Sequence, residues 1–422
     1  MSLELILKKL FKKKSKTRSH HKFPLKDSTF RDKDLIEGIK VILSKNMTMS
    51  DITKKFEKLF SKDLKTSYST MVNSGSSANL LAIQCLINPY RKNRLNKGDE
   101  VLIPAVCWPT SFWPIIQSGL KPVFVDVEKE TFNICLKDLE KKISKKTKAL
   151  MLVHVLGNSP NMDKLMKMIN RRKIILIEDT CESIGAKYKG KFLGTFGEFS
   201  SFSFYYSHQI SSVEGGMISC KTKSDEDIIK SLRSHGWARG LSNQKYIEKS
   251  NKNINKKFLF VNSGFNFRPT DIQASIGISQ FKSLQSFIKV RVINRNKLIK
   301  SLTKDPRWNN QVKFVDVRKN LKPSWFGLSM LLNAKYKSQK RTIFLRLDKH
   351  GIENRPIISG NFLKQPALKK YNIKQKSINF PNANYIHELG FFVGLKSSSL
   401  TSDQISKFTN LLLKRVTIDL SG

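Results

Sequence analysis

The sequence predicts an α/β protein with a mostly parallel central sheet flanked by helices, followed by a smaller α+β domain. Three observations support this fold class. Apolar, β-prone segments alternate with helical segments between residues 68 and 180, which is typical of βαβ units. After about residue 285 the alternation stops, and a long helical segment precedes isolated strand-like and helix-like pieces. The length of 422 residues exceeds what one simple core needs, so two or more domains are expected.

We divide the chain into three parts. Residues 1–34 are predicted to form a basic N-terminal extension, residues 35–284 a large α/β domain with N-terminal helices, and residues 285–422 a small C-terminal α+β domain. The extension contains "MSLELILKKLFKKKSKTRSHHK", which can form a short basic helix with one apolar side. Such a helix can touch an anionic membrane, but we favour a packing extension without membrane contact.

The elements of the large domain can be followed in order. Residues 35–66 have helical periodicity, and in the parallel units that follow, ligands are expected beyond the carboxyl ends of the strands. The polar, Asn- and Lys-rich residues 241–257 are predicted to be a surface loop. The predicted strands are residues 68–74, 99–106, 121–127, 148–157 and 173–180, and the helices between them are residues 75–87, 108–119, 136–144 and 162–172.

In the small domain the pattern predicts a long helix over residues 287–302. A strand is expected within residues 324–332, and a helix within residues 339–353. We find no internal repeat, and no apolar run reaches the roughly 18 residues that a membrane span needs.

The net charge of +44 allows two interpretations. A nucleic-acid-binding protein can carry such a charge, but the 77 lysines and arginines are spread along the whole chain with no arginine-rich block. We therefore interpret the charge as solvated surface and predict no nucleic-acid partner. A field of this sign would still attract an anionic substrate.

The five cysteines are isolated from one another, and none forms a C-x-C or C-x-x-C pair. This pattern argues against zinc and iron–sulfur sites and fits a reducing compartment. No secretory cleavage signal follows the N-terminal apolar residues, so we predict a cytoplasmic protein. The cysteines are Cys85, Cys107, Cys135, Cys181 and Cys220.

Residues 192–220 contain no lysine or arginine, although an even spread of basic residues would place about five there. Because solvent faces accumulate charge, this stretch is predicted to be buried. His208 lies in its middle, in "SFSFYYSHQISSVEGGMIS". Taken alone, a histidine in such a place is more often structural than catalytic.

Two strand ends carry candidate binding residues. Ser76 and Ser77 follow Gly75 in "NSGSSANLL", at a strand-to-helix junction that can cradle a phosphate or merely cap the helix. Glu178 and Asp179 end an apolar strand, where a carboxylate can orient a basic ring nitrogen, bind a metal or cap the next turn. We favour a site without metal, because no ligand-spaced histidine or carboxylate partners are nearby.

Taken together and in this order, the sequence segments are specific enough to indicate a protein family. The serine turn is followed by "PAVCWPTS", "EDTCESIGAKYKG", "GTFGEFSSFSFYYS", "EGGMIS" and "GFNFRPTDIQASIG". From about residue 23 to the C-terminus, this order resembles the DegT-type sugar aminotransferases, which are pyridoxal-phosphate enzymes of the type I aminotransferase fold. The resemblance makes residues 35–284 the cofactor-binding domain and predicts a homodimer.

The resemblance also implies roles for individual residues. Trp108 would stack on the cofactor ring, Asp179 would pair with the pyridine nitrogen, and Glu182 would lie near the phenolic oxygen. Asn266 would reach across the dimer interface into the partner's site. The cofactor phosphate would be held by Ser76, Ser77 and Ser203.

The chain departs from the family at His208. Ordinary members carry a lysine there, which forms the Schiff base with the cofactor. The histidine, with "LRSHGWARG" and "GIENRPIISGNF", is similar to the sugar 3-dehydratase subgroup, and most similar to its members that use a GDP-linked 4-keto-6-deoxy hexose. The CDP-hexulose branch adds an iron–sulfur cluster on clustered cysteines. Because this chain has no cysteine after Gly240, we predict no cluster.

The resemblance implies a lyase of deoxysugar and O-antigen (lipopolysaccharide) biosynthesis. Glutamate would convert pyridoxal phosphate to pyridoxamine phosphate, and His208, titrating near neutrality, would take a proton and return it to the departing 3-hydroxyl. Arg239 and Arg355 would hold anionic groups of glutamate or of the nucleotide sugar. Three alternatives remain open: a nucleotide-sugar 4-aminotransferase, an iron–sulfur-type CDP-hexulose 3-dehydrase, and a catalytically silent ligand-binding homologue.

Overall fold

The computed structural model describes residues 5–7, 29–48 and 50–414. Most of the predicted basic extension, with the membrane contact considered for it, lies outside the described residues. Among the helices of the described part, none is both long enough and apolar enough to cross a membrane.

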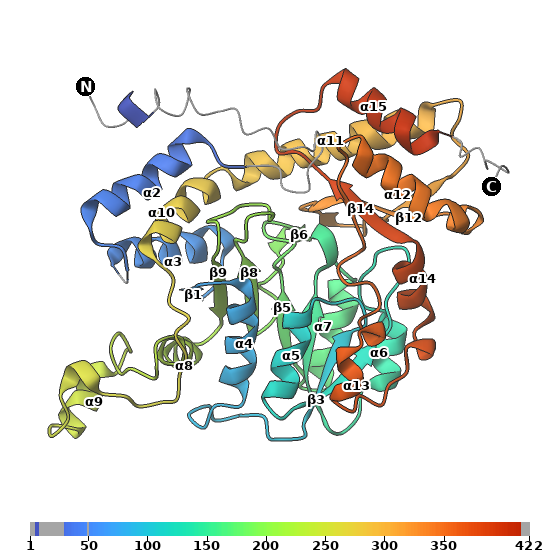
Figure 1. Ribbon diagram of the computed structural model, residues 1–422. Coiled ribbons are helices and arrows are strands. Elements are labelled where there is room, and N and C mark those ends of the chain that lie inside the picture. The colour runs from blue at the N-terminus through green and yellow to red at the C-terminus, as the bar shows by residue number, and fades with distance from the viewer. Residues whose placement is uncertain (1–4, 8–28, 49, 415–422) are drawn as a thin grey trace.

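A seven-stranded sheet forms the centre of the molecule (Figure 1). Its order is β1-β9-β8-β5-β4-β2-β3, and the neighbours from β8 to β3 run parallel, whereas β9 is antiparallel to both β1 and β8. The predicted fold class is therefore confirmed. The strands are β1 (Tyr68–Val72), β2 (Glu100–Pro104), β3 (Lys121–Val125), β4 (Thr147–Val153), β5 (Ile175–Asp179), β8 (Phe199–Ser203) and β9 (Gly216–Cys220).

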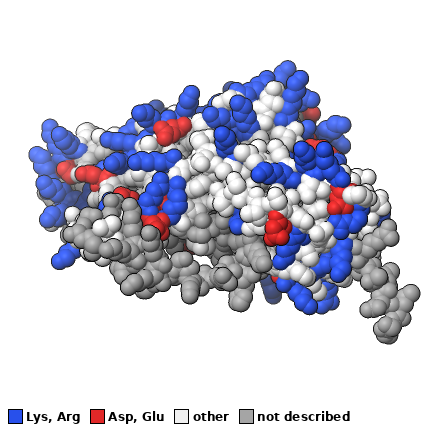
Figure 2. All heavy atoms as spheres, turned by 90° about the horizontal axis from the view of Figure 1, so that it is seen from above, with Lys and Arg blue, Asp and Glu red and all other residues white. Residues whose placement is uncertain are grey.

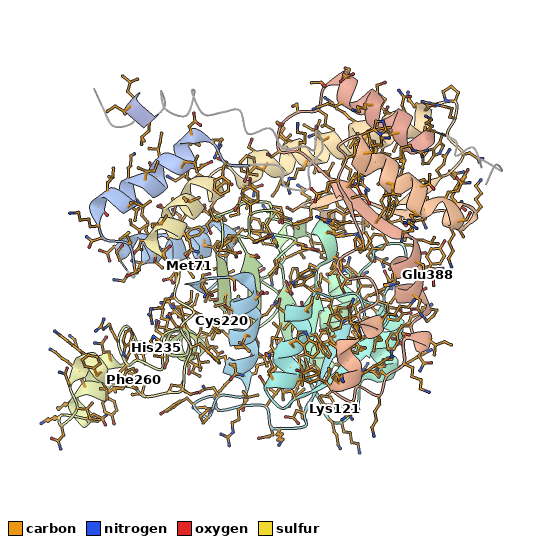
Figure 3. All side chains as sticks on the ribbon, in the orientation of Figure 1. Met71, Lys121, Cys220, His235, Phe260 and Glu388 are labelled. Atoms are coloured by element: carbon orange, nitrogen blue, oxygen red, sulfur yellow. The ribbon has the colours of Figure 1, made fainter. Side chains whose placement is uncertain are left out.

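Two strands of this sheet were not predicted from the sequence. Every residue of β8 and β9 is buried, as predicted for the stretch without lysine or arginine, but the loop between the two strands exposes Tyr205, Val213 and Glu214, and His208 is only partly buried. Strand β9 inserts between β8 and the first strand of the chain, so that Met71 pairs with Met217 and Tyr68 with Cys220. Figure 3 labels Met71 and Cys220 at this junction.

Helices cover both faces of the sheet. Alternate strand residues enter two separate cores: Val101 and Ile103 pack with α4, α5 and α8, whereas Leu102 packs with α6 and α7. This division follows from the period of two along a strand, which sends successive side chains to opposite faces. These helices are α4 (Gly75–Leu86), α5 (Pro109–Gln117), α6 (Leu136–Lys142), α7 (Met162–Arg171) and α8 (Lys223–Arg233).

The predicted N-terminal helices are α2 (Asp32–Ser44) and α3 (Asp51–Leu64), and α2 begins three residues before the predicted boundary at residue 35. Both pack against α10 (Asp271–Phe281). The carboxylate of Asp271 accepts hydrogen bonds from the backbone N–H of Ser50 and from both the N–H and the hydroxyl of Thr53. The start of α3 is thereby fixed to the start of α10.

Residues 241–257 form an arm rather than a plain loop. They include α9 (Gln244–Ser250), which has no buried residue and projects from the body of the molecule (Figure 1). His235 and Phe260, labelled in Figure 3, lie in the segments that lead to and from this arm. The polar composition predicted exposure correctly but missed the helix.

The C-terminal part begins with α11 (Leu284–Lys304) and contains a second, antiparallel sheet of order β10-β12-β14-β13. A small third sheet, β11-β6-β7, hydrogen-bonds this part to the residues after β5. The division into domains at residue 285 remains a prediction. The remaining elements are β6 (Lys187–Tyr188), β7 (Lys191–Phe192), β10 (Val312–Phe314), β11 (Leu321–Lys322), β12 (Gly327–Leu332), α12 (Lys340–Lys349), β13 (Asn354–Arg355), α13 (Ala367–Lys370), α14 (Pro381–Leu389), β14 (Gly390–Gly394), α15 (Ser402–Leu413) and the short 3-10 helices Val155–Gly157, Lys256–Phe258, Ala334–Gln339, Phe362–Lys364 and Ser377–Asn379.

Basic side chains are scattered over the described part of the face seen in Figure 2. Figure 2 shows the face above the sheet, with lysines and arginines distributed across it and acidic groups between them. This distribution agrees with charged side chains that lie on solvent-exposed faces.

Candidate active site

A cavity of about 600 Å³ lies at the carboxyl ends of the central strands. It is bounded by the residues that follow β4, β5 and β8, by the N-terminus of α4, and by residues of the small sheet around Phe326 and Phe392. This is the edge at which ligands bind in parallel α/β sheets. Seven of the ten predicted site residues line it, namely Ser76, Trp108, Asp179, Glu182, Ser203, His208 and Arg355.

The N-terminus of α4 forms the base of the cavity. Ser74 caps the helix by accepting a hydrogen bond from the Ser77 backbone N–H at 3.1 Å. A methyl group on Gly75 would lie 2.6 Å from the Cβ atom of Ser203, so only glycine lets the helix approach this close. A helix N-terminus beside two serine hydroxyls, those of Ser76 and Ser203, suits a phosphate group.

Ser77 is adjacent to this cradle but does not line the cavity. Its hydroxyl donates a hydrogen bond to the Asn73 side-chain oxygen at 2.6 Å. The side chain therefore stabilises the turn into α4, and its predicted contact with a phosphate remains untested.

Asp179 is the best-fixed acid of the cavity. It is buried at the end of β5, and its Oδ2 atom accepts hydrogen bonds from Asn79 Nδ2 at 2.8 Å and Ser111 Oγ at 2.7 Å. Oδ1 accepts from the backbone N–H of Cys181 at 3.1 Å. Neither Asn79 nor Ser111 was predicted, because no short motif connects helices α4 and α5 to this strand. A carboxylate held in this way fits a protonated ring nitrogen.

The neighbouring acid, Glu178, has a structural role. It is fully buried and accepts hydrogen bonds from His154 Nε2 at 2.9 Å and from the backbone N–H groups of Gly194, Phe196 and Gly197. Burial would raise the pKa of Glu178, but these hydrogen bonds lower it. The strand-end pattern left Glu178 and Asp179 equivalent and the family resemblance favoured Asp179; their hydrogen-bond partners now distinguish the two acids.

Glu182 lines the cavity, and its pKa is shifted in the opposite direction from that of Glu178. Burial and the nearby charge of Asp179 raise its pKa to about 8, although the Leu156 backbone N–H, which donates to Oε2 at 3.1 Å, works against this shift. The carboxyl group is therefore protonated near pH 7. In that form it can donate a hydrogen bond to an oxygen of a bound group.

His208 lies in the loop between β8 and β9, with part of its ring facing the cavity. The ring packs edge-to-face against Tyr205 and Phe326, with centroids 6.0 Å and 5.3 Å away, and its Nδ1 atom is buried without a partner in the described part of the chain. Burial and the positive charge of Arg291 lower its pKa to about 4. Our expectation that it titrates near neutrality is corrected: at pH 7 the imidazole is neutral.

Trp108 provides a flat apolar wall. It precedes α5, and 55% of its surface is exposed, which is unusual for so large an apolar side chain. Because it borders the cavity, its indole is available to stack on a planar ring. Glu214, which was not predicted, also lines the cavity, and burial raises its pKa.

Two predicted residues lie away from the cavity of their own chain. The guanidinium of Arg239 stands 5.0 Å from the ring centroid of Trp237, at the base of the arm, and Asn266 forms an isolated β-bridge with Ser234. Arg355 does border the cavity, and its Nη2 atom lies 2.6 Å from a carboxylate oxygen of Glu353.

These features fit pyridoxal phosphate: a helix terminus and serines for the phosphate, a fixed carboxylate for the ring nitrogen, and an exposed indole for the ring. The chain belongs to the DegT/DnrJ/EryC1/StrS aminotransferase family, whose sequence profile matches residues 30–412. It is 38% identical to GDP-4-keto-6-deoxy-D-mannose 3-dehydratase of Escherichia coli O55:H7, over 88% of this chain and 95% of that protein.

Solved structures agree with this assignment. The E. coli GDP-4-keto-6-deoxy-D-mannose-3-dehydratase with bound hydrated PLP superimposes with a TM-score of 0.86 at 37% identity, covering 93% of this chain and 99% of the other. A GDP-4-keto-6-deoxymannose-3-dehydratase with a trapped PLP–glutamate geminal diamine gives 0.85 at 36% identity, covering 92% and 100%.

Proposed function

We propose that the chain is a pyridoxal-phosphate-dependent nucleotide-sugar 3-dehydratase. It would be a lyase that removes the 3-hydroxyl of a GDP-linked 4-keto-6-deoxy hexose, with glutamate as amino donor, in deoxysugar and O-antigen biosynthesis. The observation that carries the proposal is the neutral histidine at position 208, which lines the cavity of an aminotransferase-family chain. The relatives described above, named as 3-dehydratases, support the same reaction.

The cofactor would be held without a covalent bond to the chain. Ser76, Ser203 and the N-terminus of α4 would bind its phosphate, with Ser77 fixing the turn, and Trp108 would cover one face of its ring. When bound, the cofactor accepts the amino group of glutamate and provides an electron sink for loss of the 3-hydroxyl.

Two acids would tune the bound ring in opposite ways. Asp179 would hold the ring nitrogen in its protonated form, because its carboxylate is already oriented by Asn79 and Ser111. Glu182, protonated near pH 7, would donate a hydrogen bond to the phenolic oxygen. A deprotonated carboxylate there would repel that oxygen, so the raised pKa of Glu182 serves this contact.

His208 would move the proton. In its neutral form it can accept a proton at the ring nitrogen that faces the cavity. Because its pKa is lowered to about 4, the imidazolium that forms is a stronger acid than usual and readily gives the proton to the departing 3-hydroxyl. A lysine at this position would carry an amine that forms a Schiff base with the cofactor. Histidine has no such amine.

Anionic groups would be recognised at the rim of the cavity. Arg355 borders the cavity and would pair with a carboxylate of glutamate or with the diphosphate. Arg239 lies outside it, so we assign its predicted contact to a ligand that extends toward the arm or to the site of a second subunit.

We also propose that the protein is a homodimer. Asn266 does not line the cavity of its own chain, which fits a residue donated to a partner's site. The arm and the residues that directly follow it expose large apolar side chains that a second copy would cover. Tyr246 is 73% exposed, and Phe258, Phe260 and Ile254 are also exposed. Light scattering at several concentrations tests this, since a fully active monomer would contradict it.

The five cysteines form no disulfide, which supports the proposed cytoplasmic location. The described residues contain no group of three or more potential metal ligands. The absence of an iron–sulfur cluster nevertheless stays a prediction, to be tested by iron and sulfide analysis of purified protein.

The function is tested with glutamate, cofactor and a panel of 4-keto-6-deoxy nucleotide sugars. A 3-dehydratase yields a product one oxygen atom lighter, together with ammonia and 2-oxoglutarate. A 4-aminotransferase instead retains nitrogen in the sugar and releases no ammonia. Accumulation of an amino sugar would therefore replace the proposal with its nearest alternative, and no reaction with any sugar would favour a silent homologue.

A further inference from the structure

Residues 355–362, here termed the strap, join the C-terminal sheet to the wall of the cavity. The strap begins in β13, which pairs with β14. At its other end, the backbone N–H of Phe362 donates a hydrogen bond at 2.8 Å to the carbonyl oxygen of Ala105, directly after β2 of the central sheet. The first part of the strap borders the cavity, and the last part is fixed to the central sheet. The side chains of the strap that line the cavity are Arg355, Pro356 and Ile358.

Ser359 connects the strap to the residue that precedes Trp108. Its hydroxyl donates a hydrogen bond to the backbone carbonyl oxygen of Cys107 at 2.6 Å. Cys107 is fully buried, whereas 55% of the surface of Trp108 is exposed and its side chain borders the cavity. The hydroxyl of Ser359 therefore holds the peptide group from which the Trp108 residue begins.

The turn that presents Ser359 has an unusual conformation. Ile358 has a φ of 49°, in the left-handed region that β-branched residues rarely adopt. The backbone N–H of Gly360 donates to the carbonyl oxygen of Ile357 at 2.7 Å and closes the turn. A strained conformation of this kind persists only where the surrounding contacts determine it. The strap is therefore held in one shape rather than draped over the cavity.

The end of the strap is anchored on the other side of Trp108. The buried ring of Phe362 packs against Phe112 of α5, with centroids 5.0 Å apart. Asn361 is also buried, and its Nδ2 atom donates to Asn384 Oδ1 at 2.9 Å. Because Trp108 directly precedes α5, the strap contacts the chain both before and after this tryptophan.

Packing alone gives the Trp108 indole little support, because more than half of the side chain is exposed. The direction in which the indole leaves the main chain then depends on the peptide group between residues 107 and 108. The Ser359 hydrogen bond fixes that group. A planar wall that is set in place before a ligand arrives costs less to order on binding.

We propose that Ser359 is a positioning residue that holds Trp108 ready to stack on the ring of the cofactor. The hydroxyl acts through the Cys107 carbonyl and does not itself line the cavity. This inference rests on the role given to Trp108 in the proposed function.

The first test is cofactor binding, measured by absorbance titration with pyridoxal phosphate and without any sugar. Ser359→Ala should weaken binding by about 2- to 10-fold, because the cofactor must then order an indole that the wild type presents in place. An unchanged dissociation constant would overturn the proposal. If Ser359→Ala does not fold, Ser359→Cys takes its place, since a thiol is similar in size but a much weaker donor.

A double-mutant cycle tests whether Ser359 acts through Trp108. Trp108→Ala should weaken binding by itself. Adding Ser359→Ala to it should change the dissociation constant by less than about 1.5-fold, because no indole is left to position. If Ser359→Ala weakens binding as much in the Trp108→Ala background as in the wild type, Ser359 acts on the site by another route and the proposal is wrong.

Ser301→Ala is the matched control. The Ser301 hydroxyl shares a hydrogen bond of 2.7 Å with Thr409 Oγ1 in the C-terminal part, and neither residue lines the cavity of the described chain. Both serine variants remove one hydrogen bond and should lower Tm to a similar small extent. Only Ser359→Ala should weaken cofactor binding, so an equal weakening in Ser301→Ala would reduce the effect of Ser359 to general stability and overturn the proposal.

Fluorine NMR separates this inference from the proposed function. Protein labelled with 5-fluorotryptophan has five tryptophan signals, and that of Trp108 is the one that Trp108→Phe removes. In the cofactor-free protein, Ser359→Ala should move this signal toward its position in unfolded protein, and Ser301→Ala should leave it in place. An unmoved signal in Ser359→Ala overturns the positioning role, whatever the enzyme does with sugars. Conversely, failure of every sugar in the product assay contradicts the proposed function and leaves the fluorine result intact.

Discussion

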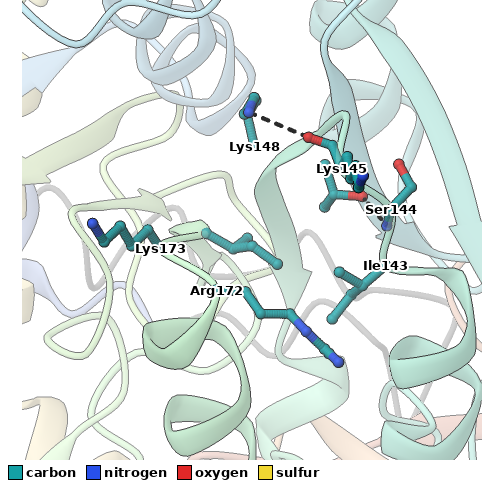
Figure 4. A pocket seen from close by; sticks show the side chains of 8 residues that line it. Ile143, Ser144, Lys145, Lys148, Arg172 and Lys173 are labelled. Carbon is teal, nitrogen blue, oxygen red and sulfur yellow. Dashed lines mark hydrogen bonds between the residues drawn. The ribbon is translucent and has the colours of Figure 1, made fainter.

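The two edges of the central sheet differ in how they hold charge. At the carboxyl edge, the cavity is lined by three acids and one arginine, and Asp179 and the neighbouring Glu178 are buried with several donors each. At the amino edge, an open hollow of about 670 Å³ is lined by lysines and an arginine beside the starts of β4 and β5 (Figure 4). The basic residues there are Lys145, Lys148, Arg172 and Lys173.

A high density of charged side chains therefore does not mark the functional site of this chain. In the described part, the four basic residues of the amino edge form no ion pair, and Lys148 reaches only the carbonyl oxygen of Lys145, at 3.3 Å. Water screens such groups. At the carboxyl edge the low dielectric strengthens each interaction, so that one buried charge can change the state of a neighbour.

The largest expected effect is at the carboxyl edge, on His208. Replacement by Asn should lower the rate of dehydration by ~100- to 10,000-fold, because a general base of this kind contributes that much. Cofactor binding, measured by absorbance titration, should remain close to wild type, because Asp179 and Trp108 are unchanged. The rate is measured in single turnover with the cofactor already in its amine form, and an unchanged rate would show that His208 is structural.

The second effect concerns the close approach of α4 and β8. Gly75→Ala places a methyl group 2.6 Å from the Cβ atom of Ser203 and should destabilise the fold by about 1–3 kcal/mol while weakening cofactor binding. Thermal unfolding and cofactor titration measure both. Gly190→Ala is the comparison variant, because its added methyl group meets open space and carries only the cost of a positive φ. Equal losses in the two variants would contradict a steric origin.

The third effect is a pH dependence due to Glu182. Its folded-state pKa is raised to about 8 from an ordinary value of 4.5, so between these values the folded state binds a proton that the unfolded state lacks. The free energy of unfolding should therefore fall as pH rises from about 4.5 to 8. In Glu182→Gln this contribution is absent, and denaturant titrations of the cofactor-free protein should show a flatter decline. An identical decline in both proteins would mean that the Glu182 carboxyl group is exposed to solvent and that its pKa is not raised.

The smallest effect is expected at the amino edge. Replacing Lys145, Lys148, Arg172 and Lys173 together by Gln should leave kcat and KM for the sugar within about twofold of wild type, since exposed charges are screened. Arg355→Gln at the carboxyl edge removes a single charge, but it should raise KM by more than the variant with four substitutions does. The reverse order would mean that the basic hollow takes part in substrate capture.

The sequence predicted five strands of the large sheet because their apolar runs alternate with helical periods. It missed β8 and β9, which contain serine, glycine and cysteine without a clear apolar period and are buried on both faces. The site residues that belong to motifs, such as Trp108 and Asp179, were found by resemblance to a family. Their roles remain to be tested by the experiments above.

A short motif cannot show which side chains contact a site residue from distant positions in the sequence. Asn79 and Ser111 meet Asp179 from helices 100 and 68 residues away. The low pKa of His208 likewise depends first on its burial and then on the charge of Arg291, which lies on a helix of the C-terminal part. Only the folded chain brings these groups together, which explains why the titration of His208 was misjudged from the sequence.

The position of β9 has a consequence for how the protein is made. The first strand of the chain, β1, has no sheet neighbour until Gly216–Cys220 has been synthesised, because β9 separates it from β8. The cavity closes later still, when residues as far along as Phe392 join its wall. Contacts of such long range fold slowly. A ribosome therefore carries nearly the whole polypeptide before the wall of the cavity is complete, and a chain truncated before its last strand would lack the part of that wall around Phe392.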